Sequence, residues 1–308
     1  MKNKLRKNYK FILGMIFGIV ISASSVYAAT VLTSKEVSYD NTNSKLSSTN
    51  VKDAIDEVNE KATTKLEEAE KSCPKGYICT IEPLSFKNDS WTTISANVKA
   101  GKATQYKVGD TKEIDMGDLG THTVRVSNTS SCTNGETSET ACGFVVEFAD
   151  IISLQSMNSS GGSSGGWPAS EMRTYVNETV YNALPNDLQN VIATTKVISA
   201  SGISETPNFA SNDKLYLLST KEVWNGGTEY DTAEAETRQL DYYKNKVVTK
   251  SNYSEAIKQY NGSNANWWLR SASSYNTGDF WNVRDNGAWK SIRAYSTYGV
   301  APAFRITQ

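Results

Sequence analysis

The chain has 308 residues, with 32 Lys and Arg against 33 Asp and Glu and a single His. A formal charge of −1 leaves no broad basic field, so we expect no nucleic-acid partner. One His excludes a metal site built on two imidazoles. About 39% apolar residues, with Gly counted and Tyr not, is below the roughly 45–50% of an ordinary globular chain, so polar loops are expected.

The amino terminus has the order of a secretory signal. Five basic residues precede an apolar run, residues 11–21, and small residues follow up to Ala28. The apolar run is about half the roughly 20 residues that a membrane-spanning helix needs. We therefore predict that residues 1–28 are a signal peptide and that the mature chain is secreted or held at the cell surface. An uncleaved signal anchor is the alternative, and the only route to a membrane that we expect.

An exported chain would meet an oxidising compartment, so its four cysteines are expected to form disulfides. Cys73 with Cys79 and Cys132 with Cys142 are the sequence-local pairings among three connectivities. Four thiolates around zinc are the alternative, but the spacings are not those of paired Cys-x-x-Cys knuckles. We predict two bridges, no metal and no cofactor.

A polar linker, residues 29–49, and a helix, residues 50–72, are predicted next. Asn50 suits the N-cap, and apolar residues recur after it at steps of three and four. The stripe is narrow and rich in Ala. The helix is therefore either a stalk that self-associates through residues 50–70 or a spacer docked on the main domain.

Residues 73–308 are predicted to form one α+β domain of short elements separated by turn residues. The predicted strands are 121–127, 143–152, 195–199, 214–219, 266–271, 279–284 and 299–306, and the predicted helices are 169–177, 186–193, 232–244 and 254–260. A Gly/Ser run, residues 159–166, is interpreted as a mobile loop whose deletion would be tolerated.

Several short motifs in the carboxy-terminal half resemble a family of exported bacterial proteins, the domain of unknown function six-two-seven-three. They are Trp267-Trp268-Leu269-Arg270-Ser271, Phe280-Trp281-Asn282-Val283, Asn286-Gly287 and Gly299-Val300-Ala301-Pro302-Ala303-Phe304-Arg305-Ile306. Upstream motifs such as Gly166-Trp167-Pro168 and Leu217-Leu218-Ser219 extend the resemblance over residues 108–306. The resemblance implies a C-type-lectin-like fold, in which helices flank small antiparallel sheets and long carboxy-terminal loops present a binding face.

Two relatives of that fold are tested by this sequence. Calcium-dependent sugar lectins carry Glu-Pro-Asn or Gln-Pro-Asp together with Trp-Asn-Asp, but here Glu205-Thr206-Pro207-Asn208 is interrupted and Val283 follows Trp281-Asn282. Formylglycine-generating enzymes use reactive cysteines near the carboxy terminus, and this chain has none after Cys142. Neither activity is expected.

Residues 273–298 are the candidate binding segment. They are rich in Tyr, Ser, Asn, Arg and Trp, the residue types of adaptable binding faces. The mixture also resembles the variable segment of proteins diversified by retroelements, although ordinary solvent-facing loops of exported proteins have similar composition. The candidate ligand-binding residues are Tyr275, Asn276, Asp279, Phe280, Asn282, Arg284, Asp285, Asn286, Trp289, Lys290, Arg293, Tyr295 and Tyr298.

A second set of residues is assigned to the framework that would hold this segment. It comprises Trp267, Trp268, Leu269, Arg270, Trp281, Val283, Gly299, Pro302 and Phe304. In strand 279–284, Trp281 and Val283 are expected to point inward and Phe280, Asn282 and Arg284 outward, although the assignment could be reversed. Arg270 is expected to pair with Glu222 or Asp231.

These features favour a non-enzymatic protein that binds an extracellular protein or glycan through its carboxy-terminal loops. A carbohydrate-active enzyme is the first alternative, but no motif nominates the two carboxylates that glycoside hydrolysis needs. A structural component of the cell envelope is the second, because a helical stalk would suit one. The only His, His122, is interpreted as a strand residue facing solvent and not as a catalytic base.

Overall fold

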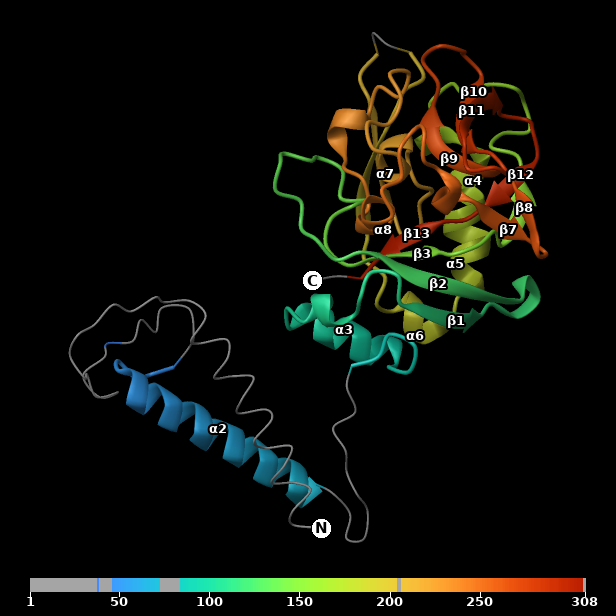
Figure 1. Ribbon diagram of the computed structural model, residues 1–308. Helices are drawn as coiled ribbons and strands as arrows, with labels where there is room; N and C mark the ends of the chain where they lie inside the picture. Colours follow the sequence, from blue (N-terminus) through green and yellow to red (C-terminus); the bar gives the residue numbers. More distant parts are fainter. Residues whose placement is uncertain (1–37, 39–45, 73–83, 204–205, 307–308) are drawn as a thin grey trace. The chain divides into compact units, whose positions relative to one another are not determined.

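The computed structural model describes residues 38, 46–72, 84–203 and 206–306 (Figure 1). The chain divides into two compact units, Met1–Glu82 and Pro83–Gln308. The predicted signal peptide and the predicted Cys73–Cys79 bridge lie outside the described residues. In the described part of the chain, no helix has both the length and the apolar character that crossing a membrane requires.

The first unit contains the helix α2 (Val51–Ser72). The side-chain oxygen of Asn50 accepts a hydrogen bond from the backbone N–H of Asp53 at 2.9 Å, so Asn50 caps the helix as the sequence predicts. Ion pairs between Lys52 and Asp56 and between Lys61 and Glu57 join neighbouring turns of the exposed surface. The use of this helix as a stalk or for self-association stays a prediction.

The second unit is built from short helices and strands, so the α+β class is confirmed. Its helices are α3 (Trp91–Lys99), α4 (Glu171–Tyr175), α5 (Tyr181–Ala183), α6 (Asn186–Gln189), α7 (Thr220–Val223) and α8 (Asp241–Asn245). Its strands are β1 (Thr111–Asp115), β2 (Thr121–Asn128), β3 (Val145–Phe148), β4 (Ser153–Gln155), β5 (Thr195–Ser199), β6 (Phe209–Asp213), β7 (Lys258–Tyr260), β8 (Ser263–Ala265), β9 (Trp267–Ala272), β10 (Asp279–Val283), β11 (Trp289–Arg293), β12 (Tyr298–Val300) and β13 (Ala303–Arg305).

Two main sheets and two hairpins organise these strands. The first sheet has the order β1-β2-β3-β13 and is antiparallel. The second has the order β11-β10-β9-β12-β4, in which β12 runs parallel to β9. Strands β5 and β6 and strands β7 and β8 form the hairpins. The last strand of the chain thus closes the sheet that the first two strands of the unit begin.

The predicted strand 299–306 is wrong as a single element, because it forms β12 in one sheet and β13 in the other. Pro302 lies between them and has no N–H to donate to a ladder, which favours a break at this point. Its carbonyl oxygen accepts a hydrogen bond from the backbone N–H of Phe148 at 2.9 Å. The break carries the chain from the second sheet into the first and joins both sheets to one core.

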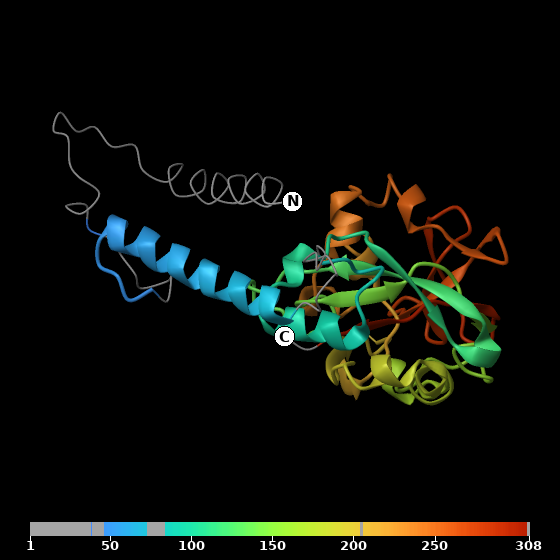
Figure 2. The ribbon, with the colours of Figure 1, turned by 90° about the horizontal axis from the view of Figure 1, so that it is seen from below.

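The hydrophobic core lies between the sheets and the helices. Helix α3 lies against the four-stranded sheet (Figure 2), where the rings of Trp91 and Phe304 are 6.2 Å apart. A buried ionic cluster supports the same sheet, with Glu147 bonded to both Arg125 and Lys258. Burial lowers the pKa of Lys258 to about 8 although Glu147 acts in the opposite direction.

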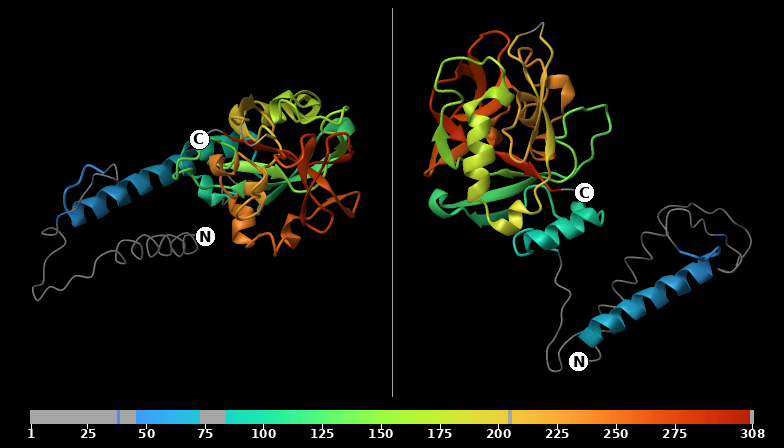
Figure 3. Two further views of the ribbon diagram at one scale, coloured as in Figure 1. Left: turned by 90° about the horizontal axis from the view of Figure 1, so that it is seen from above. Right: turned by 180° about the vertical axis from the view of Figure 1, so that it is seen from behind.

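Strands β10 and β11 lie at the opposite end of the unit from α3 and α6 (Figures 1 and 3).

Some predicted elements are present and others are wrong. Strands 121–127, 195–199, 266–271 and 279–284 are found within one residue at each end. Predicted strand 143–152 narrows to β3, predicted strand 214–219 makes only a single bridge between Tyr216 and Ala303, and predicted helix 254–260 ends in the strand β7. Predicted helix 232–244 shortens to α8, predicted helix 186–193 to α6, and predicted helix 169–177 extends through a π-helical turn into α5.

The Gly/Ser run 159–166 is not a dispensable loop. The hydroxyl of buried Ser163 accepts a hydrogen bond from the backbone N–H of Gly278 at 2.9 Å. Gly166 has a φ of 56° and is buried, and a Cβ there would lie 2.8 Å from the carbonyl oxygen of Ala200. Gly is used here for its backbone freedom and small size, so the prediction that deletion is tolerated is withdrawn.

Replacing Gly166 by Ala should lower the free energy of unfolding by about 1–3 kcal/mol, because the new methyl group meets fixed backbone at a positive φ. Gly162→Ala is the matched control, since nothing lies within 4 Å of a Cβ at that exposed position. Chemical denaturation of both variants measures the difference. Equal stability of the two variants would contradict this account of the loop.

Candidate functional site

The candidate segment is built on two strands that are fully buried. Every residue of β9 and of β10 is buried. Strand β10 lies between β9 and β11, and its pairing with β11 runs from Asp279↔Arg293 to Val283↔Trp289. The framework residues proposed from the sequence are likewise all buried, and they hold the β10–β11 hairpin in place.

The candidate ligand-binding residues divide by exposure. Tyr275, Arg284, Asp285, Asn286, Trp289, Lys290, Arg293 and Tyr295 are exposed, whereas Asn276 and Tyr298 are partly buried. Asp279, Phe280 and Asn282 are buried, so the prediction that Phe280 and Asn282 face outward is wrong. The reason is that β10 has a strand on each side and is covered on both faces, so alternation along it leads to no solvent face. The side-chain amide of Asn282 instead donates to the carbonyl oxygen of Lys290 at 2.7 Å.

The exposed candidates lie at the two ends of the β10–β11 hairpin. Tyr275, Arg293 and Tyr295 belong to the end where the chain enters β10 and leaves β11, which we call the entry end. Arg284, Asp285, Asn286, Trp289 and Lys290 belong to the connecting turn, which we call the turn end. Strands of five residues span roughly 17 Å, so the two ends form neighbouring patches and not one pocket.

At the entry end, aromatic rings and glycines meet closely. The ring of Tyr275 lies 5.0 Å from that of Tyr230, a residue that the sequence analysis did not single out. The ring of Tyr295 covers Gly161, where a Cβ would be 2.9 Å from Tyr295 Cδ1. Arg293 Nε lies 3.6 Å from the carboxylate of buried Asp279. The Gly/Ser run, residues 159–166, therefore packs against the entry end of the hairpin.

At the turn end, Trp289 is held by its neighbours and still exposed. Its ring lies 5.5 Å from that of buried Trp281 in an edge-on arrangement, and Lys250 Nζ lies 5.7 Å from its centroid. Gly287 has a φ of 87° and approaches the carbonyl oxygen of Tyr253 so closely that a Cβ would be 2.1 Å away. Packing beneath the turn thus fixes the direction in which Trp289 points.

Arg270 pairs with Glu222 beneath the hairpin, one of the two partners predicted for it. Two hydrogen bonds of 2.6 and 2.7 Å join the guanidinium to the carboxylate, and both side chains are fully buried. The remaining N–H groups of Arg270 donate to the carbonyl oxygens of Ile198 and Leu217 and to the hydroxyl of Thr140. Burial alone raises the pKa of Glu222, but the charge and hydrogen bonds of Arg270 outweigh it and the pKa is lowered. The pair is a structural element and is not accessible to a ligand.

The only His of the chain is also held by the fold. A ring nitrogen of His122 lies 2.7 Å from the carbonyl oxygen of Leu119, and the side chain is partly buried. The bridge between Cys132 and Cys142 is present as predicted. In the described residues, no three His, Cys, Asp or Glu side chains are grouped so that they could hold a metal ion.

Replacing Glu222 by Gln should destabilise the protein by about 3–5 kcal/mol, because the buried charge of Arg270 would lose its counter-ion. Glu255→Gln is the control, since the pair of Glu255 with Lys246 is exposed and should contribute less than about 1 kcal/mol. Denaturant unfolding at neutral pH measures both variants. A loss for Glu222→Gln as small as that of the control would show that the pair does not hold the frame.

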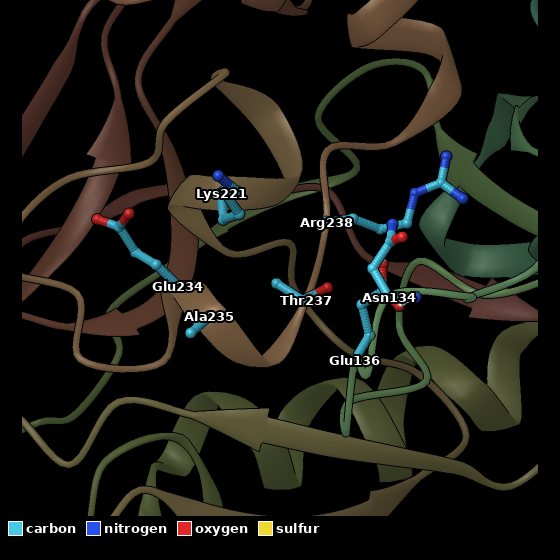
Figure 4. A pocket seen from close by; sticks show the side chains of 7 residues that line it. All are labelled: Asn134, Glu136, Lys221, Glu234, Ala235, Thr237 and Arg238. Atoms are coloured by element: carbon cyan, nitrogen blue, oxygen red, sulfur yellow. Dashed lines mark hydrogen bonds between the residues drawn. The ribbon is translucent and has the colours of Figure 1, made fainter.

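A hollow of about 490 Å³ is lined by residues outside the β10–β11 hairpin (Figure 4). It is lined by Asn134, Glu136, Lys221, Glu234, Ala235, Thr237 and Arg238. One carboxylate oxygen of Glu234 is buried without a hydrogen-bond partner, and a Cβ at Gly227 would lie 2.7 Å from Glu234 Cδ. Burial, with the nearby charge of Asp231, raises the pKa of Glu234 to about 7. The hollow carries charges of both signs, and nothing in the sequence around Glu234 signals that one of its carboxylate oxygens is buried.

The raised pKa of Glu234 gives a pH dependence of stability. The folded chain holds the proton up to about pH 7 and the unfolded chain only to about pH 4.5, so this group's contribution to stability falls as pH rises between those values. Glu234→Gln removes that dependence. The melting temperature of the variant minus that of the wild type should therefore be larger at pH 8 than at pH 5. Melting curves across that range measure it, and a difference between the two proteins that does not change with pH would contradict it.

A family model matches the carboxy-terminal half of the chain. A family model described as "Domain of unknown function (DUF6273)" matches residues 145–308, which include the whole β10–β11 hairpin and its framework. The chain matches no curated protein and no solved structure. Because the match covers more than half of the sequence, the chain belongs to the family of the Domain of unknown function (DUF6273).

Proposed function

We propose that this protein is an exported or surface-associated ligand-binding protein and not an enzyme, and that it binds through the exposed residues of the β10–β11 hairpin. One observation carries the proposal. The exposed large apolar side chains of the unit Pro83–Gln308 are Leu154, Ile203, Val247, Tyr275, Trp289 and Tyr295 in its described part. The three aromatic ones all belong to residues 273–298. Exposed aromatic residues gathered in one segment are typical of a binding surface.

The support beneath these residues favours binding as well. Strands β9 and β10 are buried throughout, and the rings of Trp289 and Tyr295 rest on Trp281 and Gly161. Side chains that are already held in position lose less conformational entropy when a ligand binds. A rigid frame that carries aromatic and cationic side chains is therefore suited to recognition without further folding.

The distance between the two ends of the hairpin indicates how large a ligand that contacts both must be. The entry end carries Tyr275, Arg293 and Tyr295, and the turn end carries Arg284, Trp289 and Lys290. The two patches are separated by the length of the hairpin, about 17 Å. A ligand that uses both must be large, so we propose an extracellular protein or an extended glycan and not a small molecule.

We also propose the finer fold assignment and the cellular location. A C-type-lectin-like fold is supported by the order of the strands. The last strand, β13, pairs with β3 in the first sheet, and every strand of the second sheet lies between β3 and β13 in the sequence. Export is supported by the amino-terminal sequence and by the Cys132–Cys142 disulfide, since disulfides persist in oxidising compartments. Retroelement diversification of residues 273–298 would be limited to the exposed positions, because Phe280 and Asn282 are core residues.

A matched pair of triple variants tests the binding proposal. Tyr275→Ser, Trp289→Ser and Tyr295→Ser together should abolish ligand binding detected on glycan and extracellular-protein arrays, because they remove the exposed aromatic surface. Leu154→Ser, Ile203→Ser and Val247→Ser together remove comparably exposed apolar side chains elsewhere and should leave binding within about twofold.

Three outcomes would contradict the proposal. The aromatic variant could bind as the wild type does, or the aliphatic variant could lose binding equally. The wild-type protein could also release reducing ends from a polysaccharide panel, which would instead favour a carbohydrate-active enzyme. Circular dichroism of both triple variants ensures that folded proteins are compared.

A further inference from the structure

Strand β11 is an edge of the five-stranded sheet, and its hydrogen bonds show which groups face outward. The N–H of Ala294 donates to the carbonyl oxygen of Gly278, and the N–H of Arg284 donates to that of Ala288. Hydrogen-bonded pairs alternate along an antiparallel ladder, so Lys290 and Ile292 also direct their backbone groups toward β10. Trp289, Ser291 and Arg293 therefore direct theirs toward the free edge.

The outward backbone groups of Trp289 and Ser291 have no hydrogen-bond partner among the described residues. In the part of the chain that the structure describes, neither residue's N–H or C=O is hydrogen-bonded to another segment along this edge. The carbonyl oxygen of Arg293 accepts a hydrogen bond from the N–H of Ser296 at 2.9 Å, which marks where the free edge ends. The result is a short row of donors and acceptors in the spacing of a β-ladder.

The side chains of this edge strand differ from those of β1, an edge strand of the other sheet. Strand β1 has the same length but carries Lys112, Glu113 and Asp115, charges of both signs, and no exposed large apolar side chain. Charged side chains along an edge strand oppose pairing with another chain, and on β11 they are of one sign only, so they do not oppose a partner of the opposite charge. Strand β11 instead begins at exposed Trp289 and is followed by exposed Tyr295.

The charged side chains of β11 itself are positive. Arg284, Lys290 and Arg293 are exposed on the hairpin, and Lys250 lies beside the Trp289 ring. Asp285 is the exposed acidic residue among the candidates, because Asp279 is buried. Positive side chains on both faces of the strand favour acidic side chains on whatever lies next to it.

We propose that β11 binds an extended acidic segment of a partner polypeptide as an added strand. The inference rests on the proposed binding function and names its partner class, a polypeptide and not a glycan. Backbone groups of Trp289 and Ser291 hydrogen-bond to the added strand, Trp289 and Tyr295 cover its ends, and Lys290 and Arg293 pair with its carboxylates.

Ser291 allows a selective test, because its N–H is not used within the sheet. Ser291→Pro removes that N–H and places a ring on the free edge, while the hydrogen bonds between β10 and β11 through residues 290 and 292 remain. Ser291→Ala is the matched control, since it keeps the N–H and likewise loses the contact of the Ser291 hydroxyl with Asp279.

The probe is a phage-displayed library of random dodecapeptides selected on the full chain, followed by titration of the selected peptides. We expect selected peptides to be rich in Asp and Glu, to bind the Ala variant within about twofold and to bind the Pro variant at least about tenfold more weakly. Hydrogen exchange of the wild-type protein gives a second measurement that needs no variant. The amides of Trp289 and Ser291 should become protected when peptide binds.

Several results would overturn the inference. They are equal affinity of the Pro and Ala variants, neutral or basic selected peptides, no enrichment of peptides, or unchanged exchange at Ser291. Self-association of the chain that Ser291→Pro abolishes would assign the edge to a second copy instead. Glycan or protein binding that depends on the aromatic residues but not on Ser291 would leave the proposed function standing and remove only this inference.

Discussion

The ion pair between Arg270 and Glu222 is the constraint on which the second unit depends. Arg270 lies in the middle of β9 and Glu222 in α7, and both are completely buried. Each N–H of the guanidinium has an acceptor, and Glu222 also closes the cap of its own helix by accepting from the N–H of Ser219 at 2.9 Å. A buried pair is favourable only when its remaining groups are satisfied in this way. The pair therefore fixes α7, the segment at Leu217 and β9 relative to one another.

The surface follows from this frame. Strand β9 is held by Arg270, β10 is enclosed between β9 and β11, and the side chains that reach solvent do so only at the ends of the hairpin and along β11. Asp231 lies beside the pair and accepts hydrogen bonds from Thr220 and Ser271, so the loop that carries Tyr230 is held as well. The rigid interior and the exposed aromatic residues are thus separate parts of one segment of sequence.

The sequence predicted the framework better than it predicted the surface. Clusters of Trp, Leu and Phe and short alternating runs locate β2, β5, β9 and β10. Arg270 lies inside such a cluster, and a charged residue there predicts a carboxylate partner, which is Glu222. Periodicity failed for Phe280 and Asn282 because a central strand has no solvent face. Helix α3 was missed because it packs on partners distant in sequence, such as Phe304. Strand β11 was missed because it is a short edge strand with no buried residue, so no apolar alternation marks it in the sequence. Gly166 was misread because glycine in a mobile loop and glycine in a tight contact have the same composition.

The separation of frame and surface is tested most directly by saturation mutagenesis of residues 266–306, with protease resistance of the displayed domain measured for every variant in the full chain. Substitutions at Trp267, Phe280 and Asn282 should abolish resistance, whereas polar substitutions at Tyr275, Trp289 and Tyr295 should leave it unchanged. Loss of resistance at the three exposed aromatic residues, as severe as the loss at the buried ones, would contradict the account.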